Sequence, residues 1–321
     1  MDRHRARGRR ARPSRRKPLL YTAVASAVLV GATATGAVYV KAQAHDGPGA
    51  VSSAAASASP SSSPTVTEEA SVEPVAEPAV DRDALLAKAM RAVTVAAGAK
   101  ASVAVLDLDS GASAAYGDAA FDTASIVKVN ILAALLLQAQ DADRHLTAQE
   151  KTYATAMIEH SDNASATALW RAIGRADGLD AANKRFGLTD TEGGEGELWG
   201  LTQTTASDQL TLLRQVFGDE SELGESSRSY LQGLMGEIAA GQRWGVSAAA
   251  DGSQWALKNG WLPRSTTGLW DINSIGRVSA DGHAYLVAAL SNGNSTQTKG
   301  ISLVEAVSKA ALSVFRDITE D

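Results

Sequence analysis

The sequence predicts an α+β fold in which a single antiparallel sheet is built from both ends of the folded region. Segments with strand character occur within residues 102–116 and again within 254–290, and the residues between them follow a helical period. Helical patterns also occupy both ends, over residues 81–97 and 301–315. We therefore expect a sheet flanked by an N-terminal and a C-terminal helix, with the middle helices forming a separate lobe.

The individual elements can be assigned in chain order. The segment SVAVLDL at 102–108 has strand character, and a turn at Asp109-Ser110-Gly111 leads into a second strand at 112–116. The helices expected in the middle of the chain span residues 125–140, 148–159, 164–173, 205–217 and 225–238. Strand character returns in residues 254–258, 268–278 and 284–290.

The first 44 residues have the pattern of an export segment. Residues 1–17 carry eight arginines, one lysine and one aspartate, and the 22 residues of 19–40 contain no charge. Such a run is long enough to cross a bilayer, and the positive charge ahead of it places the start of the chain in the cytoplasm. Because Ala42 and Ala44 fit a cleavage site, residues 1–44 are either a cleaved signal peptide or a retained membrane anchor.

Residues 45–80 form a linker by composition. They are rich in Ser, Ala and Pro, with five acidic residues and no basic ones, so they cannot bury enough apolar surface to fold. The folded domain is then expected to span residues 81–321. We expect this domain to be a monomer outside the cytoplasm, either secreted or anchored to the outer face of the cytoplasmic membrane.

The composition argues against several classes of function. The chain has no cysteine, which excludes disulfides, thiol catalysis and zinc–thiolate sites. Its five histidines are scattered, so we expect no metal site. The net charge of −6 becomes −14 once the +8 of residues 1–17 is set aside, and this disfavours nucleic acid as a partner. No glycine-rich phosphate loop follows a strand, so we expect no organic cofactor.

The stretch FDTASIVKVNIL, residues 121–132, places Ser125 three residues before Lys128 at the start of an apolar run. Residues three apart project from the same side of a helix, so the amine can approach the hydroxyl. Burial lowers the pKa of a lysine, and a neutral amine can take the proton of a serine. The same pattern also fits a serine that caps the helix beside a lysine that reaches solvent.

Two further motifs give this pair a context. Residues 161–163 read Ser-Asp-Asn between two helical segments, and residues 258–260 read Lys-Asn-Gly at the end of a strand. Taken singly, the first also fits a helix cap and the second a hairpin turn. The order S-x-x-K, S-D-N and K-x-G resembles that of the penicillin-recognising serine enzymes, and residues 81–321 resemble class A β-lactamases and related penicillin-binding proteins. The resemblance implies a β-lactamase/transpeptidase-like fold.

The resemblance also assigns catalytic roles. It makes Ser125 the nucleophile that becomes acylated and Lys128 its proton acceptor or relay. It makes Ser161 the group that passes a proton to the leaving nitrogen. Glu197 lies near the place of the glutamate that holds the hydrolytic water in the family, with Glu192 and Glu195 as rivals in the same glycine-rich stretch. The same stretch also fits a solvated acidic loop without a catalytic role.

The substrate-binding residues follow from the same resemblance. Asn163 is expected to contact the substrate amide, and Lys258 its carboxylate. The backbone N–H groups of Ser125 and Trp261 are expected to form the oxyanion hole. Gly260 is expected to leave room for the substrate backbone beside the strand.

Three features depart from the family pattern. Asn259 stands where the family has Thr or Ser, so an amide replaces a hydroxyl that would meet the substrate carboxylate. Four residues after Glu197 the chain has Leu201 and not asparagine, so the hydrolytic water loses a partner and the acyl-enzyme is expected to persist. Only 36 residues separate the first and second motifs, which predicts a more open site that suits a larger or polymeric ligand.

We therefore expect an exported serine hydrolase of the class A β-lactamase type, acting on a β-lactam or a related cell-wall amide. A D-alanyl-D-alanine peptidase that acts on peptidoglycan stem peptides is a second interpretation, because such enzymes lack the glutamate. The third is a non-catalytic penicillin-binding or cell-surface binding module, in which Asn259 and the altered loop mark a loss of catalysis.

Overall fold

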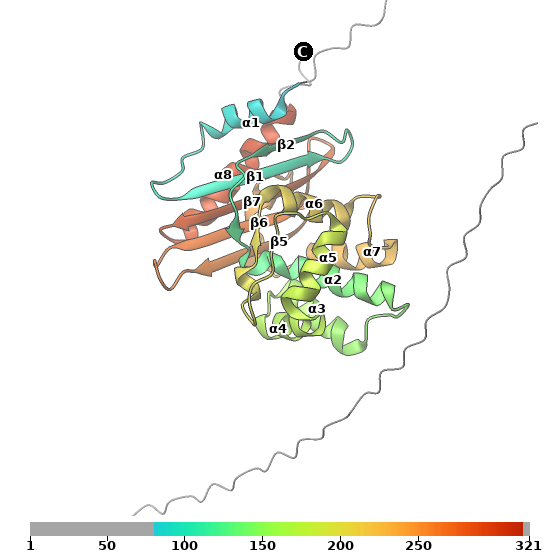
Figure 1. Cartoon of the computed structure of the whole chain (residues 1–321). Helices are drawn as coiled ribbons and strands as arrows, with labels where there is room; N and C mark the ends of the chain where they lie inside the picture. Colours follow the sequence, from blue (N-terminus) through green and yellow to red (C-terminus); the bar gives the residue numbers. More distant parts are fainter. Residues whose placement is uncertain (1–79, 317–321) are drawn as a thin grey trace, which may run out of the picture. The chain divides into compact units, whose positions relative to one another are not determined.

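The structure is a computed structural model that describes residues 80–316. The strands of its main sheet are β1 (Lys100–Asp107), β2 (Ser113–Tyr116), β5 (Trp255–Pro263), β6 (Trp270–Ala280) and β7 (His283–Asn294). They pair antiparallel in the order β2-β1-β7-β6-β5, so that strands from the two ends of the described region meet at β1 and β7 (Figure 1). The predicted α+β fold with one antiparallel sheet is thereby confirmed. A second, small sheet pairs β3 (Phe121–Asp122) with β4 (Gln203–Thr204).

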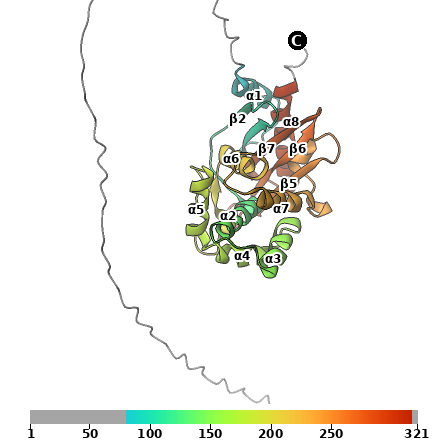
Figure 2. The ribbon, with the colours of Figure 1, turned by 90° about the vertical axis from the view of Figure 1, so that its right-hand side faces the viewer.

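The described part of the chain also contains eight α-helices. They are α1 (Arg82–Met90), α2 (Val127–Asp141), α3 (Ala148–Glu159), α4 (Asn163–Ala172), α5 (Arg175–Phe186), α6 (Ala206–Phe217), α7 (Glu225–Gly236) and α8 (Gln297–Arg316). Short 3₁₀ turns occur at η1 (Ala124–Ile126), η2 (Trp199–Leu201), η3 (Ala240–Gln242) and η4 (Gly245–Ala249). Helices α1 and α8 lie together beside the sheet, and α2 to α7 form the separate lobe (Figures 1 and 2).

The sheet is buried on both faces. Alternate residues of its central strands pack against α1 and α8 on one face and against the helical lobe on the other. Val103 and Val105 of β1 belong to the apolar cluster that contains Leu86 of α1. Ala104 and Leu106, between and after them, belong to the cluster of the helical lobe. This two-residue period explains why the strands read as nearly continuous apolar runs. Strand β5 is an edge strand of this sheet and packs against η1 and α7.

Several helix starts follow from local side-chain chemistry. Thr147 and Glu150 form a capping box at α3, whose bounds match the prediction. Asp162 accepts the backbone N–H of Ser165 at 2.7 Å, and Thr205 caps α6 in the same way. These caps satisfy backbone donors that the helix itself leaves unpaired.

The structure corrects three expectations about individual elements. The N-terminal helix ends at Met90 and does not continue to residue 97. Helix α5 was not predicted, because its sequence is mostly polar, although Leu179 and Phe186 anchor it in the core. Strand β5 runs on to Pro263, so residues 258–260 lie inside a strand and do not form a hairpin turn.

The predicted export segment, residues 1–44, lies outside the described residues, as does the linker at 45–80 apart from Val80. Within residues 80–316 no helix combines the length and the apolar character that a membrane crossing requires.

Candidate active site

Ser125 and Lys128 occupy the junction between η1 and α2. Ser125 lies in the 3₁₀ turn, one residue after Ala124, whose φ of 49° is left-handed. Such a conformation is costly for a residue with a Cβ and is typical of functional turns. The turn places Ser125 just before the helix, with Ile126 as the residue that precedes α2, so the serine does not act as the helix cap.

The amine of Lys128 is enclosed by oxygen atoms. Its Nζ lies 2.9 Å from the hydroxyl of Ser125 and 2.8 Å from the side-chain oxygen of Asn163. It lies 2.7 Å from the carbonyl oxygen and 3.0 Å from the hydroxyl of Ser161. An ammonium has three hydrogens, so it cannot donate to all four oxygens at once. A neutral amine, by contrast, can accept the proton of one hydroxyl through its lone pair.

Burial determines the charge of this lysine. The side chain of Lys128 is fully buried, and this loss of hydration lowers its pKa to about 7, although the nearby carboxylate of Asp162 acts in the opposite direction. A substantial fraction of the Lys128 side chains is therefore neutral at pH 7. Lys128 does not reach solvent, which argues against the alternative of a surface lysine beside a capping serine.

Ser161 and Asn163 reach the site from the loop between α3 and α4. Ser161 has a φ of 56°, another left-handed residue, and it is Asp162 that caps α4. Ser161 is therefore free of a capping role, and its hydroxyl points to the two lysines of the site. Asn163 is the first residue of α4 and is exposed, so the cluster reaches solvent on this side.

Lys258 approaches the same hydroxyl from the sheet. Its Nζ lies 3.1 Å from the hydroxyl of Ser161, 2.9 Å from the carbonyl oxygen of Asn259 and 3.5 Å from the side-chain oxygen of Gln242. Lys258 is fully buried, and burial together with the charge of Lys128 lowers its pKa well below the usual value. The three motifs therefore converge on one cluster of two hydroxyls and two amines.

Gly260 allows the sheet to approach the Ser125 turn. A Cβ at this position would lie 2.7 Å from the carbonyl oxygen of Thr123 and 2.9 Å from the backbone nitrogen of Ser125. We expected Gly260 to leave room for the substrate backbone. In the structure, the absence of a side chain at Gly260 instead makes room for the turn that carries Ser125. Trp261 follows it in the edge strand, half-buried, with its ring 6.2 Å from that of Trp244.

Asn259 does not face the cluster, contrary to the expectation that it binds substrate. Its side-chain NH₂ group donates to the carbonyl oxygens of Gln242 at 2.7 Å and Trp244 at 2.9 Å. The residue is buried, with an exposed fraction of 1%. Because successive strand residues point to opposite faces, the side chain that follows Lys258 turns away from the site. Asn259 therefore holds the segment before β5 in place.

Glu197 is likewise not part of the cluster. Its carboxylate accepts hydrogen bonds from Arg171 at 3.0 Å and from Arg175 at 3.0 Å, and its side chain is 41% exposed. These two arginines lower its pKa. Glu192 and Glu195 are exposed as well. The expected position of the hydrolytic glutamate therefore holds a surface ion-pair group.

Two residues of the site were missed from sequence. Trp199 belongs to η2, and its ring lies over the amine of Lys128, with 5.0 Å between Nζ and the ring centroid. Gln242 contacts Lys258 through its side chain and Asn259 through its backbone. A single tryptophan in a loop and a glutamine before a strand carry no motif, so no local signal pointed to either.

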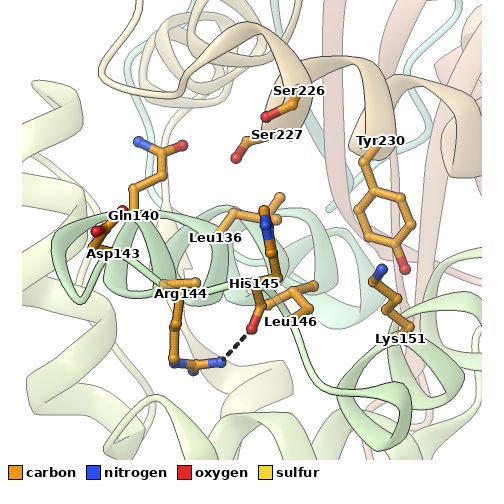
Figure 3. A pocket seen from close by; sticks show the side chains of 11 residues that line it. Leu136, Gln140, Asp143, Arg144, His145, Leu146, Lys151, Ser226, Ser227 and Tyr230 are labelled. Atoms are coloured by element: carbon orange, nitrogen blue, oxygen red, sulfur yellow. Dashed lines mark hydrogen bonds between the residues drawn. The ribbon is translucent and has the colours of Figure 1, made fainter.

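Among the cavities of the described region, two illustrate that the hollows lie away from this cluster. One, of about 440 Å³, is lined by residues of α2, α3 and α7 and by the segment that joins α2 to α3 (Figure 3). Its lining includes His145, Lys151 and Tyr230. The other, of about 1030 Å³, lies between α8 and the segment that includes the end of α1. Neither cavity is lined by any of the nine residues predicted for the site.

The comparisons with known proteins bear on the fold and the family. Among solved structures, PBP-A aligns at 22% identity with a TM-score of 0.62, over 73% of this chain and 96% of that one. The TLA-1 extended spectrum β-lactamase aligns at 17% identity and 0.63, over 73% and 98%. A β-lactamase from Xanthomonas campestris aligns at 21% identity and 0.58, over 73% and 97%. No curated protein matches the chain.

These structural likenesses establish the fold. The family itself is established by sequence, because the profile described as "Beta-lactamase enzyme family" matches residues 85–151 and 148–315, which together cover nearly all of the described region. The convergence of the three motifs lies within the same residues. The chain therefore belongs to the β-lactamase enzyme family.

Proposed function

We propose that the chain is an exported serine hydrolase that forms an acyl-enzyme at Ser125 with a β-lactam or a related cell-wall amide. One observation carries the proposal. The hydroxyl of Ser125 lies 2.9 Å from a buried amine, and that amine lies 3.0 Å from the hydroxyl of Ser161, so a proton can pass along the three groups without solvent.

Every proton transfer of the acylation step can take place among Ser125, Lys128 and Ser161. Neutral Lys128 takes the proton of Ser125, whose oxygen forms a bond to the substrate carbonyl carbon. As the bond from that carbon to the amide nitrogen breaks, the nitrogen takes the proton of Ser161, and Lys128 returns its extra proton to Ser161. The backbone N–H groups of Ser125 and Trp261 are assigned to the developing oxyanion, where each such donor is worth about 10²–10³ in rate.

Lys258 is assigned to the substrate carboxylate. An anion beside its buried amine favours the ammonium form, which reverses the effect of burial on its pKa. The charged amine then binds the substrate and still holds the Ser161 hydroxyl at 3.1 Å. Substrates that lack a carboxylate are expected to react slowly for this reason.

Hydrolysis of the acyl-enzyme is proposed to be slow. Glu197, the side chain nearest the expected place, is occupied by Arg171 and Arg175, and its rivals Glu192 and Glu195 are exposed. A related case is that of PBP-A, for which an acyl-enzyme complex of a mutant with penicillin G has been solved. The protein would then bind penicillin covalently and destroy little of it.

A D-alanyl-D-alanine peptidase remains the second candidate, and the ion-paired state of Glu197 is the observation that favours it, since such enzymes work without that glutamate. The interpretation as a non-catalytic binding module is less well supported. Burying an amine costs free energy, and this interpretation gives the buried amines of Lys128 and Lys258 no function that would explain that cost. Release of D-alanine from a stem-peptide mimic, set against hydrolysis of a chromogenic cephalosporin, distinguishes the two enzymatic candidates.

The decisive experiment is mass spectrometry of the full chain after incubation with benzylpenicillin. We expect a mass increase equal to one whole penicillin molecule, because opening the ring loses no atoms. The Ser125→Ala variant should show no adduct, whereas Ser207→Ala, which alters an exposed serine on α6, should behave as the wild type. A wild-type protein that gains no mass and turns over no cephalosporin would contradict the proposal.

A further inference from the structure

Trp199 is held firmly against the nucleophile turn. Its indole N–H donates to the hydroxyl of Thr167 at 3.1 Å, and Thr167 lies one helical turn after Asn163 on α4. The same 3₁₀ turn is joined to the Ser125 segment, because the backbone N–H of Thr123 donates to the carbonyl of Thr202 at 2.9 Å. The ring is therefore fixed by its hydrogen bond to α4, and the segment that carries it is tied to the Ser125 segment through the backbone of Thr202.

The ring completes the enclosure of Lys128. Four oxygen atoms surround the amine on the sides of Ser125, Ser161 and Asn163, and the indole face lies over it with 5.0 Å between Nζ and the centroid. An indole face attracts a cation, but this attraction is smaller than the hydration free energy that the ammonium loses where the ring displaces water. It therefore removes water from the amine and puts no base in its place.

The charges around Lys128 come from two other elements. Asp162, in the loop before α4, favours the ammonium of Lys128, and the charge of Lys128 in turn lowers the pKa of Lys258 of β5. Glu197 lies only two residues before Trp199, yet its carboxylate is directed to Arg171 and Arg175. The loop thus presents an apolar ring to the reacting groups and its carboxylate to solvent.

We propose that Trp199 is a positioning residue that acts as a water-excluding cover over Lys128 and so sets both the protonation of the amine and the lifetime of the acyl-enzyme. The part that concerns the acyl-enzyme rests on the function proposed above, whereas the part that concerns Lys128 does not. The cover favours the neutral amine for acylation, and afterwards it keeps water away from the side of the ester that faces Lys128.

The test compares three variants of the full chain. Trp199→Gln and Trp199→Ala admit water, whereas Trp199→Phe keeps an apolar ring. With benzylpenicillin, we expect the first two to hydrolyse the acyl-enzyme faster by about tenfold or more, and the Phe variant to stay near the wild type. Leu198→Ala is the matched control, because Leu198 is the neighbouring residue of the same loop and is 56% exposed. Equal lifetimes in all variants would overturn the proposal.

A second measurement is independent of acylation. Lysines labelled with ¹³C at Cε report the pKa of Lys128 by NMR titration, with Lys128→Arg to identify the signal. We expect the midpoint to move upward by about one pH unit or more in the Gln and Ala variants, because hydration favours the ammonium. An unmoved midpoint in a folded variant would overturn the role of the ring. If the wild type is not acylated, the proposed function fails, and this titration still decides whether Trp199 controls the amine.

Discussion

The protonation of Lys128 makes a quantitative prediction about the pH dependence of acylation. If the neutral amine is the base, the second-order rate constant of acylation should follow the neutral fraction of a group whose pKa is about 7. That fraction is about 1% at pH 5 and about 90% at pH 8, so the rate constant should rise about ninetyfold and then level off. An ordinary exposed lysine would give a rise that continues beyond pH 10.

The assay is the rate of adduct formation with benzylpenicillin, followed by intact-protein mass at a series of pH values. Lys128→Arg should remove the rise and lower the rate by about 10²–10⁴, because a guanidinium keeps its proton. Lys151→Arg, an exposed lysine of α3, is the matched control and should retain the full profile. A profile that is flat from pH 5 to 8, or that rises only above pH 9, would refute the assignment of Lys128 as the base.

Three further predictions follow from the site. Gly260→Ala brings a Cβ to 2.7 and 2.9 Å from backbone atoms of the Ser125 turn. It should therefore slow acylation and lower the unfolding free energy, measured by urea denaturation, by about 1–3 kcal/mol. Gly241→Ala is the control and should change neither quantity, because its Cβ meets open space. Burial lowers the pKa of Lys128 from 10.5 to about 7, so above about pH 7 the unfolded chain binds more protons than the folded one and the unfolding free energy rises with pH. Lys128→Met should remove about 2–3 kcal/mol of the rise in unfolding free energy between pH 6 and 9. A variant whose unfolding free energy rises with pH as steeply as that of the wild type would argue against a buried amine. Glu197→Gln should leave the acyl-enzyme lifetime within about twofold of the wild type, since its surface ion pairs are remote from the chemistry, and a large change would restore it to the site.

Much of the fold was accessible from sequence because its signals are local. Alternation in residues 102–108 and the capping box that begins α3 each depend on neighbours within a few positions. Helix α5 escaped prediction because only a few of its residues are buried, which leaves little periodicity to detect. The extension of β5 past residue 258 depends on its pairing with β6, which no local pattern encodes.

The sequence by itself determined which chemical groups the site contains. The order and spacing of Ser125, Lys128, Ser161 and Lys258 sufficed to predict that two hydroxyls and two amines share one site, since helix geometry relates the first pair and the family pattern the rest. The tertiary structure alone decided what surrounds them. Glu197 lies against arginines 22 and 26 residues away in the chain, and Trp199 is held over the amine by a hydrogen bond to α4. Such choices arise from packing between distant segments, and so they have no signature in the residues themselves.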